Sequence, residues 1–194
     1  MFGEGNSLSL RLVILLLLVR AWPVTAAELT DIEVEMKDGR YHLSSKTYFE
    51  ATQAQLYKVL TDYTQFTKFS SAFVESENRA PDEQGRPRFY TRLEGCVLLF
   101  CKSYIRFGHL ELKPDYDIVA ITDPELSNFE YSRERWQLIP KGEGTLLKYD
   151  FEMEPGFWVP PLVGPYVIKR TLRSNGRDAV DRIEALALGK NPKK

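Results

Sequence analysis

The chain has 194 residues, of which 43% are hydrophobic and 27% are charged, and its formal net charge is −1. This balance suits one globular domain with a proper core and argues against a nucleic-acid-binding protein, because nucleic acids attract strongly basic surfaces. The charge is uneven: residues 161–194 hold eight basic and three acidic residues, whereas residues 27–160 carry a net charge of −7.

The first 26 residues predict a targeting segment. The apolar run 12–19 is closed by Arg20, and residues 24–26 supply the small side chains that precede a cleavage site. The run is much shorter than the ~20 residues that span a bilayer. We therefore predict that residues 1–26 are a signal peptide and that the mature chain is exported, to a periplasm or to the outside, and begins at Ala27. An uncleaved anchor is the alternative.

The predicted domain opens with a hairpin of two strands. Apolar and polar residues alternate over residues 29–36, and Asp38-Gly39 suits a tight two-residue turn because glycine adopts positive φ readily. The return strand extends to about residue 50. Two short helices are expected next, one over about 54–60 and one that begins at Asp62, whose carboxylate can cap a backbone N–H.

After Ser71 the helical period disappears, and strands separated by turn signals are expected instead. They cover residues 73–79, 88–95, 101–112, 118–121, 129–139 and 145–153. The last strand alternates so that four apolar side chains share one face: Leu147, Tyr149, Phe151 and Met153.

An amphipathic helix over residues 164–188 ends the domain, and residues 190–194 form a short basic tail. Its expected core side carries Ile168, Leu172, Ala179, Ile183 and Leu186. Its expected solvent side carries Arg170, Arg173, Arg177, Asp181 and Glu184. A helix of this length needs an apolar surface to cover, which predicts an α+β fold in which a curved antiparallel sheet wraps around the helix. Such packing commonly leaves an internal cavity.

Two stretches resemble a known superfamily. Residues 59–69, continuing into 73–76, resemble the helix–helix–strand entry of the START-like superfamily (SRPBCC), which includes polyketide cyclases and coenzyme Q-binding proteins. Residues 136–145 resemble its penultimate hairpin. The resemblance implies a helix-grip fold over residues 27–189 and a cavity for a hydrophobic small molecule or lipid, but no single catalytic motif.

We expect seven residues to line or border this cavity: Trp136, Tyr149, Phe151, Trp158, Leu172, Asn175 and Gly176. Gly176 lies in the middle of the predicted helix, where glycine costs about 1 kcal/mol relative to alanine. It is tolerable where backbone and ligand approach closely, although a plain helix–sheet contact needs the same space.

Charged residues in the predicted strands offer a polar element for such a cavity. They are Arg92, Glu94, Arg106, Arg133, Glu134 and Arg135. A buried charge must be paired, so one Arg–Glu pair that points inward could orient a polar ligand head. The alternative is that all of them lie on the solvent face, since the sequence does not fix the strand phase.

The histidines and cysteines carry no clear catalytic or metal-binding pattern. His109 could face the cavity and move a proton, or could lie at the surface, and His42 shows no ligand spacing. Cys96 and Cys101 cannot form a closed zinc site by themselves. In an oxidising compartment they are predicted to form a disulfide across a hairpin, and two reduced buried thiols are the alternative. We assign no catalytic residue, metal or cofactor.

Two apolar stretches, residues 97–100 and 157–163, fall where loops would normally be polar. Two interpretations are open. The stretches pack on the body of the domain, or together they form a hydrophobic rim of the cavity or a patch that touches a membrane or a lipoprotein. The basic face of the last helix could meet an anionic membrane in the same way, or could simply be solvated.

These observations favour an exported protein that holds or carries a hydrophobic small molecule or lipid. An enzyme of the polyketide cyclase/aromatase type, using the same cavity, is the second hypothesis. A protein-interaction module that uses the apolar rim is the third, and it would need no cavity. No nucleic-acid partner is expected.

Overall fold

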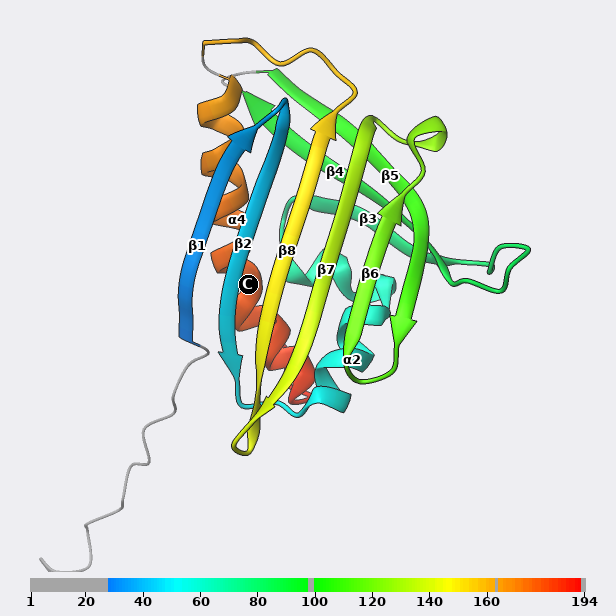
Figure 1. The fold of residues 1–194 in the computed structure, drawn as a ribbon, viewed down its shortest axis with the longest axis vertical. Coiled ribbons are helices and arrows are strands. Elements are labelled where there is room, and N and C mark those ends of the chain that lie inside the picture. The colour runs from blue at the N-terminus through cyan, green and yellow to red at the C-terminus, as the bar shows by residue number, and fades with distance from the viewer. Residues whose placement is uncertain (1–27, 98–99, 163, 193–194) are drawn as a thin grey trace, which may run out of the picture.

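The computed structural model describes residues 28–97, 100–162 and 164–192, which form one curved sheet with a long helix against it (Figure 1). The sheet has eight strands in the order β1-β2-β8-β7-β6-β5-β4-β3, and all neighbours are antiparallel. The predicted helix-grip architecture, with two short helices after the second strand, is confirmed.

The elements, in chain order, have the following bounds. They are β1 (Glu28–Lys37), β2 (Arg40–Phe49), α2 (Gln53–Thr61), the 3₁₀ helix η1 (Tyr63–Gln65), α3 (Phe66–Phe69), β3 (Phe73–Arg79), β4 (Arg88–Val97), β5 (Phe100–Lys113), β6 (Asp117–Thr122), the 3₁₀ helix η2 (Pro124–Leu126), β7 (Phe129–Lys141), β8 (Gly144–Pro155) and α4 (Gly164–Ala187). No helix among the described residues is both long and apolar enough to cross a membrane.

The turn and cap signals in the sequence form as expected. Asp38 and Gly39 have φ angles of 52° and 82°, so both central residues of the β1–β2 turn are left-handed, as a tight hairpin requires. Thr52 and Gln55 form a capping box at the start of α2. Asp62 accepts a hydrogen bond from the Thr64 backbone N–H (3.1 Å), so the helix predicted from this residue does begin there. It is a 3₁₀ turn that continues into α3.

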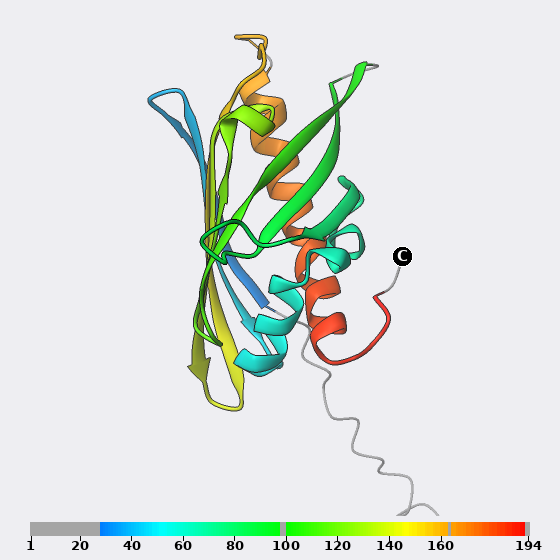
Figure 2. The ribbon, with the colours of Figure 1, turned by 90° about the vertical axis from the view of Figure 1, so that its right-hand side faces the viewer.

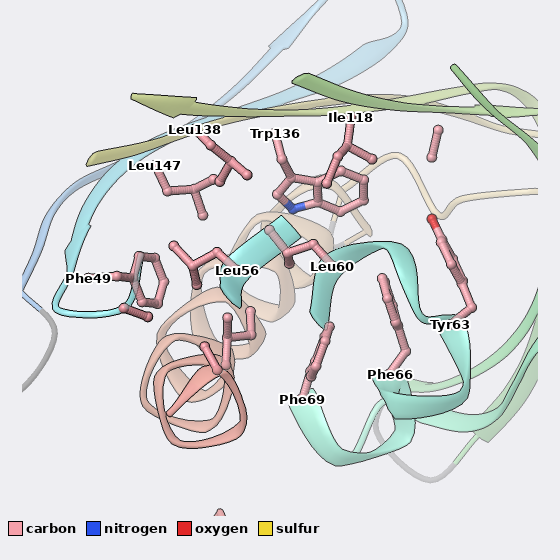
Figure 3. Close-up of a cluster of buried hydrophobic side chains, with 14 of the residues drawn as sticks. Phe49, Leu56, Leu60, Tyr63, Phe66, Phe69, Ile118, Trp136, Leu138 and Leu147 are labelled. Atoms are coloured by element: carbon pink, nitrogen blue, oxygen red, sulfur yellow. The ribbon is translucent and has the colours of Figure 1, made fainter. Parts of the chain in front are cut away.

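A dense aromatic cluster closes one end of the fold, between α2, η1, α3 and the sheet (Figure 3). The Tyr63 ring stacks on Phe66 at 4.0 Å and on Phe89 at 4.5 Å between ring centroids. Leu56 and Leu60 of α2 are fully buried in the same cluster. Through these contacts the two short helices close one end of the curved sheet.

Helix α4 runs diagonally along the inner face of the sheet (Figure 2). Its second half packs into the aromatic cluster through Val180, Ile183 and Ala187, all buried. In its first half, Ile168 and Leu172 are half-buried against a second cluster formed by β1, β2, β7 and β8. The two halves of the helix therefore have different environments, and the first is the looser one.

The prediction that Glu184 lies on the solvent side of α4 is wrong. Its carboxylate accepts hydrogen bonds from the backbone N–H groups of Ala51 (3.1 Å) and Glu50 (3.2 Å), in the connection between β2 and α2. Burial raises the pKa of this carboxyl, although both backbone bonds act to lower it. The chain after β2 covers a side of α4 that a helix packed on the sheet alone would expose.

Replacing Glu184 with alanine is expected to lower the free energy of unfolding by about 1–3 kcal/mol, because the N–H of fully buried Ala51 would lose its partner. Asp181→Ala, one turn away on the exposed side, is the control and should change it by no more than about 0.5 kcal/mol. Urea unfolding of both variants makes the comparison. Equal effects would show that the bond to Ala51 contributes nothing.

Candidate functional site

A cavity of about 320 Å³ lies between the inner face of the sheet and α4. Inward-facing side chains of β2, β4, β5, β7 and β8 form one wall, because alternate residues of a strand point to the same face. Residues of α4 from Gly164 to Ile183, α3 and the segment after β8 form the others. Most lining residues are apolar. The cavity lies mainly beside the first half of α4, where Ile168 and Leu172 are only half-buried, whereas Val180, Ile183 and Ala187 of the second half are buried.

The structure places all seven predicted site residues around this cavity. Trp136, Tyr149 and Phe151 come from β7 and β8, with ring centroids 5.6 Å and 6.5 Å apart along the row. Trp158 lies after β8, and the remaining three, Leu172, Asn175 and Gly176, are on α4. Their contact with a ligand stays a prediction.

One charged pair points into the cavity. Arg106 of β5 and Glu134 of β7 form a salt bridge of 2.8 Å, and their side chains are only 3% and 8% exposed. The two side chains meet across the intervening strand β6, on which Ala120 is opposite Glu134. The inward Arg–Glu pair that the sequence left open therefore exists, and these are its two members.

Tyr149 completes this polar group, which we call the buried triad: Arg106, Glu134 and Tyr149. The Tyr149 hydroxyl donates to the second carboxylate oxygen of Glu134 at 2.7 Å. Burial, followed by the neighbouring Glu134 charge, holds the pKa of Tyr149 well above its ordinary value. The phenol therefore stays protonated and acts as a hydrogen-bond donor.

The apolar surroundings make the triad's internal bonds strong and costly to break. The Arg106 guanidinium lies 5.4 Å from the Phe151 ring centroid and 5.8 Å from that of Phe89. Burial is the largest single influence on the pKa of Arg106 and acts to lower it, but the charge and hydrogen bond of Glu134 together with the neighbouring Tyr63 and Tyr149 turn the net direction upward. Because the salt bridge pairs opposite charges, the triad presents no net charge to the cavity.

Several polar atoms around the triad have no hydrogen-bond partner among the described residues. They include Nε of Arg106, the hydroxyl of Tyr63 and the hydroxyl of Thr91, which lies opposite Arg106 in the β4–β5 pairing. Figure 3 shows the Tyr63 hydroxyl directed toward the sheet. Buried polar groups in proteins are nearly always paired, so this concentration of unpaired ones marks a place suited to a polar group from outside the chain.

The other strand charges lie outside the cavity or at its edge. Arg92 pairs with Glu75 (2.8 Å) and with Glu94 (3.4 Å), and Glu94 is an exposed residue at the cavity border. Arg135 pairs with Asp117 at 2.9 Å on the opposite face of β7 from the triad. Arg133 precedes Glu134 in β7 and so lies on the opposite face of the strand, the face of Arg135.

Neither histidine belongs to the cavity. His109 Nε2 is 2.9 Å from an Arg86 guanidinium nitrogen, and burial together with this cation lowers its pKa. His42 lies opposite Glu152 at 3.6 Å, on the outer face of β2. Among the described residues, no group of three or more His, Cys, Asp or Glu side chains could hold a metal ion. The cavity wall thus offers hydrogen bonding and apolar contact, without a nucleophile–base pair.

The two apolar stretches differ in how far the structure describes them. Phe157 packs into the body, stacked on Tyr104 at 4.2 Å between ring centroids, whereas Trp158 and Leu162 are exposed. Val163 and the side chains of residues 97–100 lie outside the described residues. The second stretch therefore combines both alternatives: Phe157 anchors it on the body, whereas Trp158 and Leu162 face outward.

The β4–β5 pairing places Cys96 directly opposite Cys101, so the predicted hairpin is present. The disulfide stays a prediction, since the Cys96 side chain is outside the described set.

An antiparallel sheet gripping a C-terminal helix around an apolar cavity defines a helix-grip domain of the START-like superfamily. More narrowly, the chain belongs to the family described as polyketide cyclase / dehydrase and lipid transport, whose model matches residues 40–187. The resemblance stated from the sequence is thereby confirmed.

Solved structures support the fold at low sequence identity. A STAR-related lipid transfer protein from Xanthomonas axonopodis is 15% identical, with a TM-score of 0.62 over 84% of this chain and 99% of that one. The Zhui aromatase/cyclase from Streptomyces sp. R1128 is 12% identical, with a TM-score of 0.60 over 77% and 94%. A START superfamily protein from Mycobacterium smegmatis is 19% identical, with a TM-score of 0.57 over 75% and 98%. Among curated proteins, none matches the sequence.

Proposed function

We propose that this protein binds a hydrophobic small molecule or lipid in the cavity between the sheet and α4, and that it holds or carries this ligand rather than converting it. The observation that carries the proposal is the cavity itself: about 320 Å³, mostly apolar, with one buried ion pair in its wall. Ligand pockets typically measure about 300–1,000 Å³, so this space suits one small molecule or one acyl chain. The family's association with lipid transport supports the same class of ligand.

The buried triad favours a ligand whose polar end is uncharged. Arg106 and Glu134 neutralise each other, so a free carboxylate or phosphate would bring an unpaired charge into a low-dielectric site. A hydroxyl or carbonyl group can instead bond to Arg106, which lines the cavity and whose Nε lacks a partner among the described residues. We therefore propose a mainly apolar molecule with a hydroxyl or carbonyl end.

Native mass spectrometry of the protein purified from its own host tests this function. A co-purifying apolar mass that is released by denaturation supports a carrier. A panel of long-chain alcohols and acids of equal chain length then tests the polar end by displacement of Nile red. The alcohol should compete better than the acid at a pH where the acid is ionised. No uptake of dye or of any panel member would contradict the proposal.

A cyclase-type enzyme is the second candidate, favoured by the ionisable groups in the cavity wall and by the aromatase/cyclase among the similar structures. The triad argues for the carrier, because both carboxylate oxygens of Glu134 already accept hydrogen bonds, one from Arg106 and one from Tyr149. Conversion of a bound polyketone by the wild type, lost in Glu134→Gln, would favour the enzyme.

We also propose that the protein is exported. Residues 1–27 lie outside the described residues, and the proposal is supported by the apolar run 12–19 and the small residues at 24–26. N-terminal sequencing of the exported protein is expected to begin at Ala27. In the same preparation, thiol labelling after denaturation without reductant should leave Cys96 and Cys101 unlabelled. An intact N-terminus would show that the apolar run is retained as an anchor, and two labelled cysteines would contradict the disulfide.

A further inference from the structure

Exposed apolar side chains gather at one end of the molecule. Trp158 is 79% exposed, Leu162 is 96% exposed and Tyr166, in the first turn of α4, is 66% exposed. Two more exposed hydrophobic residues, Met36 and Leu126, belong to the tip of β1 and to η2. Those segments lie at the same end of the fold as the connection from β8 to α4 (Figures 1 and 2). A soluble surface rarely concentrates large apolar side chains in this way unless it meets a partner.

A row of basic residues continues from this apolar group along α4. Lys169, Arg170, Arg173 and Arg177 recur every three or four residues after Tyr166, so they share one side of the helix. The three arginines are exposed, and no acidic residue occurs in α4 before Asp178. Within the described part of the chain, none of the four takes part in a salt bridge. This basic stripe therefore offers its full charge to an external partner.

The cavity opens at the same place. Trp158 lines the cavity while most of its surface faces solvent, and Thr171 of α4 is likewise both a lining residue and exposed. Glu94 of β4 is the other exposed lining residue, so the opening lies among the segment after β8, the first half of α4 and the end of β4, beside the basic stripe. A surface that covers the apolar group would also cover this opening.

We propose that this end of the molecule, formed by Trp158, Leu162, Tyr166 and the basic stripe, docks on a membrane that contains anionic lipids. Tryptophan and tyrosine favour the headgroup region of a bilayer, and each nearby Lys or Arg adds attraction to an anionic leaflet. Docking brings the cavity opening against the lipid, so that a hydrophobic ligand can pass between bilayer and cavity without crossing water. This docking goes beyond the proposed function and can be measured with no ligand present.

Quenching of Trp158 by brominated lipid tests the contact directly. In the full chain carrying Trp22→Phe, fluorescence comes from Trp136, which is buried, and from Trp158. Brominated phosphatidylcholine vesicles should quench Trp158 more strongly when phosphatidylserine is included, and added salt should weaken the effect. Quenching that is equal with and without phosphatidylserine would overturn the anionic part of the proposal, and no quenching would overturn all of it.

Charge reversal separates this end of the molecule from the rest. Arg170→Glu/Arg173→Glu is expected to weaken binding to phosphatidylserine vesicles by at least about tenfold, since each basic residue near the surface contributes to it. Lys58→Glu/Lys113→Glu makes the same change in net charge on α2 and at the end of β5, at the other end of the fold (Figure 1), and should bind like the wild type. Because the apolar run 12–19 is common to both variants, it cancels in the comparison.

The control readouts keep docking distinct from ligand binding. Arg170→Glu/Arg173→Glu should take up Nile red in solution as the wild type does, so lost vesicle binding with normal dye uptake supports the proposal. Equal vesicle binding by the two double variants would overturn it while leaving the cavity function intact. Size-exclusion chromatography tests a third outcome. If the wild type is a dimer and only Arg170→Glu/Arg173→Glu makes it a monomer, the surface binds a second copy of the chain instead.

Discussion

Replacing Glu134 alone with leucine is expected to lower the free energy of unfolding by about 3–5 kcal/mol, because Arg106 would remain buried without its counter-charge. Arg106 is only 3% exposed in its side chain and is flanked by the rings of Phe89 and Phe151, so water cannot replace the lost carboxylate. Urea unfolding, followed by the emission of buried Trp136 and by circular dichroism, measures the change.

Removing both charges together should behave differently. In Arg106→Met/Glu134→Leu no charge is left to desolvate, and apolar side chains of similar size can replace a buried ion pair at little cost. The Tyr149 hydroxyl would then lose its acceptor, at about 1–3 kcal/mol, so the further change Tyr149→Phe should recover most of the remaining stability.

The exposed pair Arg92–Glu75 supplies the control for this series. Glu75→Leu removes a salt bridge of the same 2.8 Å length, but solvent screens it and the unfolding midpoint should hardly move. A Glu134→Leu variant as stable as the wild type would mean that the triad is hydrated.

The triple variant Arg106→Met/Glu134→Leu/Tyr149→Phe also tests function. It should still take up Nile red, yet lose the preference for a long-chain alcohol over an acid.

The order of the elements could be predicted because each has a local cause. The hairpin follows from Asp38-Gly39, the second helix from Asp62, and the packing of α4 on the sheet from its apolar period. The sequence resemblance then supplied the way in which these elements assemble.

The strand charges show where sequence reasoning stopped. Residues 133–135 read Arg-Glu-Arg, which places a charge on either face whatever the phase. The residues that follow do indicate the phase. Glu134, Trp136 and Leu138 are alternate residues and so lie on the same face of β7, and the last two are large apolar residues that are buried. A bulge between Phe129 and Tyr131 interrupts the inward–outward alternation at the start of β7. Only the residues after the bulge therefore show which side of the sheet Glu134 faces.

Glu184 was misplaced for a different reason. A helical period identifies one buried side, but the second half of α4 contacts the sheet, α2, α3 and the connection after β2. The contacted part of the helix circumference is therefore wider than a single apolar stripe. This also explains why Val180, which is not in the predicted apolar row, is buried. Contacts of this kind depend on the path of a loop, which residue spacing within the helix does not encode.

Two substitutions on α4 should distinguish a side chain packed into the core from a position that faces the open cavity. Ile183 is 8% exposed, belongs to the aromatic cluster and borders the cavity. Ile183→Ala is therefore expected to lower the free energy of unfolding by about 2–5 kcal/mol, the usual cost of emptying a packed site. Urea unfolding measures it, and a change below that range would mean that the cluster collapses to fill the space.

Gly176→Leu, two turns earlier, is expected to leave stability unchanged or raised and to abolish Nile red uptake. A Cβ at Gly176 would meet only Ile32 Cδ1, at an ordinary contact distance of 3.6 Å, so the added side chain has the cavity to enter. Replacing a mid-helix glycine also favours the helix by up to about 1 kcal/mol. Ser174→Leu adds the same side chain to the exposed side of the helix and should bind dye normally. If Gly176→Leu unfolds the protein, the space is closed in solution. If it folds and still binds dye, the ligand lies elsewhere than against this helix.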